Sequence, residues 1–219
     1  MKIKTNFILI VFFTNSFTIW SQNCELTTRE FISQLAYEID TLNIDEYENV
    51  LINQQSISII EKSEDYFLKK YPNIFIKKDL CYYFKSIDKK ELKACSIHST
   101  LEDKENLQYE FKGQYCNNSL IFISGYESWG YISVNLTDGL AFRMSGKPLT
   151  SNCNIIYSHT QIYGEEEITI IELDTKKQLG LIIENWYTID SKQDINEIYL
   201  KMKSLDCPEE IKHIKISIK

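Results

Sequence analysis

The chain has 219 residues and a formal net charge of −7, and 43% of its residues are hydrophobic and 25% are charged. This balance is typical of a folded globular protein and argues against a disordered one. An acidic surface repels phosphate backbones, so we expect no nucleic-acid partner.

Residues 1–21 have the layout of a secretory signal peptide. Lys2 and Lys4 give a positively charged start, residues 7–13 form a short apolar run, and Ser21 is a small residue suited to cleavage. A membrane span needs about 20 apolar residues, and polar residues interrupt this stretch. We therefore expect cleavage near Ser21 and an exported protein, periplasmic or secreted.

Residues 22–75 are predicted to form a helical N-terminal segment. Apolar residues recur at helical spacing over 26–42, and Thr27 and Glu30 fit a capping box ahead of them. A second helical stretch is expected within 45–70, and the proline that follows ends it.

Residues 76–219 are predicted to form an antiparallel β region. All seven glycines lie between Gly113 and Gly180, and glycine supplies the positive φ that tight turns need. Short strand-like runs joined by short connections favour a meander of neighbouring strands. We expect strands at 80–87, 92–99, 107–112, 119–124, 130–136, 140–144, 154–162, 167–173, 179–184, 197–203 and 211–218.

The expected fold class is mainly β (α+β). We expect an antiparallel β-meander, blade-like or sandwich, with the N-terminal helical segment covering one face or edge. The helices and the β region should pack as one unit, because the only linker-like stretch, residues 102–106, is short.

The six cysteines all follow the predicted cleavage site, and an even number in an exported chain favours disulfides. Cys81 and Cys95 fall on the two arms of a predicted hairpin and form the first expected pair. The other pairings stay open. No Cys-x-x-Cys occurs, and no cysteine lies at ligand spacing from a histidine, so neither a zinc site nor a thioredoxin-like centre is expected. The disulfide candidates are Cys24, Cys81, Cys95, Cys116, Cys153 and Cys207.

Cys24 has a second interpretation, because a cysteine just after a signal can carry a lipid. The residues before it, Ser21, Gln22 and Asn23, match a lipidation signal poorly. Lipidation would also leave an odd number of cysteines. A membrane partner is therefore expected only if Cys24 is lipidated, and we favour the disulfide.

Three stretches, 148–152, 155–158 and 168–176, resemble one blade of the TolB-type (PD40, WD40-like) β-propeller repeat. Residues 131–139 resemble the second half of another blade. The resemblance covers about 50 residues, whereas a closed propeller needs about four blades. It implies four-stranded meander geometry, and propeller blades of this kind mostly serve binding.

No motif of an enzyme class stands out. The chain has no G-x-S-x-G elbow and no glycine-rich phosphate loop, and we expect no cofactor. Three histidines, His98, His159 and His213, have no metal-binding side chain at ligand spacing, so no metal site is expected. His159 precedes the acidic run 165–167 across a predicted loop. This run forms either an imidazole–carboxylate pair with His159 or a solvated acidic tip.

A group of aromatic residues is the candidate binding surface. Aromatic side chains at strand ends form either a flat platform that binds sugars or packing anchors within the core. The candidates are Tyr126, Glu127, Trp129, Tyr131 and Trp186.

The leading hypothesis is an exported, non-enzymatic protein that binds an envelope or secreted protein or a glycan. One alternative is an extracytoplasmic hydrolase of glycans or peptides that uses dispersed carboxylates near Glu127 or within 165–167. Another is a structural or inhibitor-like module whose apolar edge docks a partner strand.

Overall fold

The computed structural model describes residues 24–50, 58–86, 90–97, 107–125, 129–150 and 152–219. The predicted signal peptide at 1–21 and the linker-like stretch at 102–106 lie outside the described residues. Three residues that the sequence singled out, His98, Tyr126 and Glu127, also lie outside them.

The described residues form fifteen strands and two short helices. In chain order they are β1 (Thr27–Ser33), β2 (Tyr37–Leu42), α1 (Ile44–Glu48), α2 (Glu64–Lys70), β3 (Lys77–Lys78), β4 (Cys81–Ser86), β5 (Leu92–Cys95), β6 (Gln108–Tyr115), β7 (Asn118–Ser124), β8 (Trp129–Asn135), β9 (Leu140–Met144), β10 (Ile155–Ile162), β11 (Glu165–Glu172), β12 (Lys177–Glu184), β13 (Trp186–Asp194), β14 (Glu197–Ser204) and β15 (Ile211–Ile218). Neither helix in this part of the chain has the length and apolar character that crossing a membrane requires.

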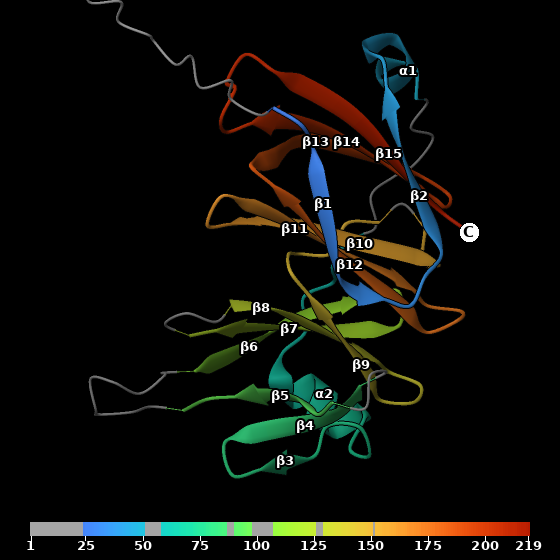
Figure 1. Ribbon diagram of the computed structural model, residues 1–219. Helices are drawn as coiled ribbons and strands as arrows, with labels where there is room; N and C mark the ends of the chain where they lie inside the picture. The colour runs from blue at the N-terminus through green and yellow to red at the C-terminus, as the bar shows by residue number, and fades with distance from the viewer. Residues whose placement is uncertain (1–23, 51–57, 87–89, 98–106, 126–128, 151) are drawn as a thin grey trace, which may run out of the picture.

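The mainly β fold class is confirmed. The strands form three sheets, in the orders β1-β12-β11-β10, β13-β14-β15-β2 and β3-β4-β9-β8-β7-β6, with β5 paired to β4 (Figure 1). The pairings are antiparallel except between β4 and β9, which run parallel. The strands expected at 140–144 and 211–218 have the predicted bounds, because an apolar or alternating run lies between clear turn residues there.

The helix predicted over 26–42 is wrong, because this stretch forms β1 and β2. Both strands pair with sheet edges made much later in the chain, and such tertiary pairing overrides weak local helix preference. At the start of β2, Tyr37 and Ile39 pack toward the core and the residues next to them are exposed. This alternation of every second residue is the period of a strand. The capping box lies at Asn43 and Glu46 of α1 instead of Thr27 and Glu30.

The two four-stranded sheets pack around one apolar cluster. β1 pairs with β12 and β2 pairs with β15, so consecutive strands of the N-terminal segment join different sheets (Figure 1). Leu35, in the corner between them, is buried in the cluster together with Trp186. The disulfide between Cys24 and Cys207 holds this segment to the connection between β14 and β15. The N-terminal strands therefore close the edge of sheets built from the C-terminal third of the chain.

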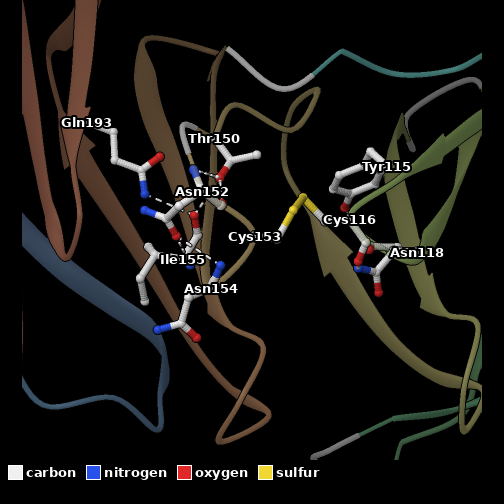
Figure 2. The surroundings of a disulfide bond; sticks show 10 residues. Tyr115, Cys116, Asn118, Thr150, Asn152, Cys153, Asn154, Ile155 and Gln193 are labelled. Atoms are coloured by element: carbon white, nitrogen blue, oxygen red, sulfur yellow. Dashed lines mark hydrogen bonds between the residues drawn. A yellow bond between two sulfur atoms is a disulfide. The ribbon is translucent and has the colours of Figure 1, made fainter. Parts of the chain in front are cut away.

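The seven-stranded sheet forms the other part of the molecule. Phe67 of α2 is buried against one face of this sheet. On the other face, a smaller cluster combines Phe142 and Met144 of β9 with Ile156 and Ile171 of the neighbouring four-stranded sheet. Figure 2 shows the disulfide between Cys116 and Cys153, which connects the β6–β7 turn with the segment before β10.

The six cysteines, which were predicted to be disulfide-bonded, form three disulfides. The pair expected from the hairpin, Cys81 with Cys95, is confirmed, and these residues lie opposite each other on β4 and β5. Because Cys24 is bonded to Cys207, its sulfur has no valence left for a lipid thioether. In the described structure the disulfide interpretation of Cys24 therefore replaces the lipid one.

Gly146 and Gly180 provide a matched test of the packing between the sheets. A Cβ on Gly146 would lie 2.3 Å from the backbone oxygen of His159, whereas one on Gly180 would meet the ring of Phe31 at 2.6 Å. Backbone in a paired strand cannot move aside, but a half-exposed ring can turn outward. We expect Gly146→Ala to reduce the free energy of unfolding by about 2 kcal/mol and Gly180→Ala by less. Urea unfolding measures both, and an equal or reversed order would contradict this packing.

Candidate functional site

The main candidate site is a cleft of about 310 Å³ between β5 and the part of the seven-stranded sheet formed by β7, β8 and β9. We call it the Trp129 cleft. Trp129 and Tyr131, two of the predicted binding residues, line it together with the charged residues Glu91, Lys93 and Arg143. A small concave site with an aromatic wall and a few polar groups is typical of ligand pockets.

Strand pairing brings the segments that carry these residues together. Trp129 begins β8, and Arg143 of β9 lies directly opposite Ile132 of β8. Lys93 comes from β5, which pairs with β4 and is fastened to it by the Cys81–Cys95 disulfide. The cleft therefore combines three strands whose relative positions are fixed by hydrogen bonds and one covalent link.

Trp129 presents a large apolar surface to solvent. Its side chain is 39% exposed, although tryptophan is highly buried on average. Gly130, the next residue, leaves part of the cleft wall without a side chain. Tyr131 is more enclosed, because its ring contacts that of Phe122 at a centroid distance of 5.0 Å. The exposed indole is thus the main aromatic surface on offer, and Tyr131 supports the wall.

The cations of the cleft make no direct hydrogen bond or ion pair with the described residues, although the charge of Arg143 acts on the nearby carboxyl of Glu167. Neither the Arg143 guanidinium nor the Lys93 ammonium makes a hydrogen bond or ion pair with any residue that the structure describes. Both side chains are exposed, as is Glu91 across the cleft. These donors and acceptors are therefore available to a ligand.

The remaining predicted binding residue, Trp186, lies in the core. It is 0% exposed in the cluster between the two four-stranded sheets, and Lys212 lies 4.8 Å above its ring. Its indole N–H donates to the backbone oxygen of Glu25 at 3.4 Å. The structure therefore corrects the expectation that Trp186 belongs to a surface platform, because burial of the whole ring removes it from any ligand.

Sequence reasoning did not single out Lys93 or Arg143. Arg143 is the one charged residue in the apolar stretch 140–144, and this interruption was the available signal. Lys93 lies in a short strand among other lysines and gave no distinct signal. The other two predicted binding residues, Tyr126 and Glu127, lie outside the described residues.

His159 and Glu166 form an imidazole–carboxyl pair, which resolves the two interpretations of the acidic run. Nδ1 of His159 lies 2.8 Å from Oε1 of Glu166, and Glu166 is only 1% exposed. Glu165 points elsewhere and pairs with Arg29 at 2.8 Å. Alternation along β11 explains this division, since neighbouring residues face opposite sides of the sheet. Among the described residues no third metal-binding side chain joins the pair.

A second polar cluster fastens α2 to the sheet. The carboxylate of Glu64 accepts hydrogen bonds from the hydroxyls of Tyr82 at 2.6 Å and Tyr109 at 2.9 Å, and Lys77 lies 3.3 Å away. Burial opposes ionisation of Glu64, but these hydrogen bonds and the charge of Lys77 outweigh it and lower the pKa of the carboxyl. The cluster is thus a structural anchor for the charged form of Glu64.

Comparisons of the chain with protein-family models, with curated proteins and with solved structures found no match. The resemblance to propeller blades therefore stays a prediction.

The His159–Glu166 pair predicts a dependence between two substitutions. His159→Ala leaves a buried carboxyl without its partner and should reduce the free energy of unfolding by about 3 kcal/mol. In a Glu166→Gln background the same change should cost about 1 kcal/mol, because a neutral amide tolerates burial better. Urea unfolding of the four proteins measures this, and equal costs in both backgrounds would show that the pair is not coupled.

The Glu64 cluster predicts a pH dependence. A lowered pKa means that the carboxylate stabilises the fold above the ordinary glutamate pKa of about 4.5 and that this contribution is lost as the pH falls through the lower, folded-state value. Glu64→Gln should therefore destabilise the protein at pH 7, and the difference from wild type should be smaller at pH 3. Urea midpoints at the two pH values test this, and a constant difference between the proteins would disprove it.

Proposed function

We propose that this protein is an exported, non-enzymatic binding protein and that its ligand is a glycan held in the Trp129 cleft. The observation that carries the proposal is the partly exposed indole of Trp129 beside the cations Lys93 and Arg143, which make no hydrogen bond or ion pair with the described residues. A sugar ring has an apolar C–H face that packs on an aromatic ring and a rim of hydroxyls that hydrogen-bond to charged side chains.

The cysteines support the export part of the proposal. Every cysteine of the chain is in a disulfide, and such bonds persist in oxidising compartments outside the cytosol. The predicted signal peptide points the same way. Export also places the protein where envelope and extracellular glycans are found.

Binding is better supported than hydrolysis. Glu91 is the only carboxylate among the described residues that line the cleft, whereas glycoside hydrolysis generally uses a pair. The acidic run proposed as an alternative centre is divided, because Glu165 pairs with Arg29 and Glu166 with His159. These two carboxylates are therefore engaged with different partners, and neither lines the Trp129 cleft.

The cleft also fits a glycan better than a protein surface. Its volume, about 310 Å³, lies at the small end of the range of pockets that hold small ligands. Stable protein partners instead bury about 800 Å² on each side of a broad interface. A short stretch of sugar units therefore matches the dimensions of this site.

Isothermal titration calorimetry with cello-, chito- and malto-oligosaccharides tests the proposal. We expect one series to bind and Trp129→Ala to weaken binding at least about tenfold, the equivalent of about 1.4 kcal/mol of lost stacking and packing. Circular dichroism should show that the variant keeps the wild-type fold, with a lower melting temperature because the tryptophan is only 39% exposed and part of its packing is lost.

Tyr163→Ala is the matched control, because this aromatic side chain is 93% exposed in the turn between β10 and β11 and does not line the cleft. It should bind as wild type does. Unchanged binding by Trp129→Ala, or release of new reducing ends from the oligosaccharides, would refute the proposed function.

A further inference from the structure

A second hollow lies on the other side of Arg143. It measures about 180 Å³ and is lined by Phe31, Arg143, Ser145, Glu167, Thr169 and Ile182. Arg143 also lines the Trp129 cleft, so the two hollows share this residue. We call the second one the Phe31 hollow.

The two hollows offer the same kinds of groups. Each has an exposed aromatic side chain, Trp129 in one (39% exposed) and Phe31 in the other (44% exposed). Each also has a carboxylate, Glu91 or Glu167, and both can use the guanidinium of Arg143. Each hollow thus combines an exposed aromatic residue with the same cation.

Phe31 is placed by an irregularity in its strand. Glu30 pairs with Leu181 and Ile32 with Gly180, so Phe31 is an additional residue between them and forms a β-bulge on an edge strand. Bulges change the direction of a side chain and are frequent next to functional sites. The Phe31 ring lies over Gly180, where even a Cβ would clash at 2.6 Å. The ring therefore rests against the sheet with one surface free.

The floor of the Phe31 hollow is tied to the Trp129 cleft. The backbone oxygen of Arg143 accepts a hydrogen bond from the side chain of Gln178 on β12. The hydroxyls of Ser145 and Thr169 lie 2.8 Å apart, which joins the segment after β9 to β11. These contacts fix β9 relative to the four-stranded sheet, so the backbone frame of the two hollows is set before any ligand binds.

The charges of the combined site cancel. Its described cations are Lys93 and Arg143, and its described carboxylates are Glu91 and Glu167. Burial raises the pKa of the Glu167 carboxyl, while the nearby charge of Arg143 lowers it. With two charges of each sign there is no net attraction for an anion or a cation. A neutral polyhydroxylated chain, which uses both donors and acceptors, matches this balance.

We infer that the ligand is an unbranched, neutral glycan chain that crosses Arg143, with one sugar ring on Trp129 and a later ring on Phe31. This inference rests on the proposed function, and it adds a second subsite and the charge of the ligand.

Titration of wild type with a disaccharide and a hexasaccharide of the neutral series that binds tests the inference. The hexasaccharide should bind at least about tenfold more tightly than the disaccharide. Phe31→Ala should remove most of this advantage and leave disaccharide binding in the Trp129 cleft, whereas Trp129→Ala should weaken both ligands. Gly180→Ala displaces the ring without removing it and should lower hexasaccharide affinity in the same direction.

Ile211→Ala is the control, because Ile211 is 47% exposed and lies at the start of β15, outside both hollows. It should keep the full hexasaccharide advantage. If Phe31→Ala also keeps that advantage, the second subsite is disproved while the proposed function stands. Tighter binding of hexagalacturonate than of the neutral hexasaccharide would overturn the neutral ligand. If wild type binds no oligosaccharide, the proposed function and the inference both fail.

Discussion

The pairing of β1 with β12 and of β2 with β15 is the constraint on which the rest of the structure depends. Two four-stranded sheets bury Trp186 and its neighbours between them, and each sheet has an edge that one of these N-terminal strands occupies. β1 and β2 follow each other in the chain and are joined by a short corner at Leu35. This corner therefore fixes the distance between the two sheets. The Cys24–Cys207 disulfide closes the same junction across 183 residues, which restricts the unfolded chain strongly.

This closure also assembles the proposed binding site. β1 carries Phe31 to the face where β9 meets the four-stranded sheet, so a residue of the first described strand joins Arg143 and Glu167. Had the segment been helical, Phe31 would have been a core-facing residue, as its spacing predicted. The bulge within β1 turns the same side chain outward over Gly180 instead. The site thus depends on a β-bulge in an edge strand. A bulge at an edge disrupts few hydrogen bonds, because the edge strand pairs with only one neighbour.

The sequence predicted most strands after residue 80 but missed β13 (Trp186–Asp194). It predicted the strands before residue 80 badly. Strands such as 140–144 and 211–218 were found because their pattern is local: alternation or an apolar run between turn residues. The helix expected over 26–42 was wrong because its spacing was compatible with a helix, while its partners, β12 and β15, lie about 140 residues or more away in the chain. Only the alternation of Tyr37 and Ile39 with acidic residues signalled a strand, and it is short.

The candidate site was predictable only in part, for a related reason. Trp129 and Tyr131 stood out as aromatic residues near a strand end, but the same reasoning included Trp186, which is buried. Composition cannot separate an exposed aromatic residue from a core one, because both satisfy the same local pattern. What distinguishes Trp129 is its surroundings: Gly130 beside it, and a cation from the neighbouring strand that makes no hydrogen bond or ion pair with the described residues. These surroundings are created by strand pairing and fixed by hydrogen bonds such as that from Gln178 to Arg143. A rigid pair of aromatic surfaces lowers the entropic cost of binding a flexible chain, and it needs a folded frame that no local motif encodes.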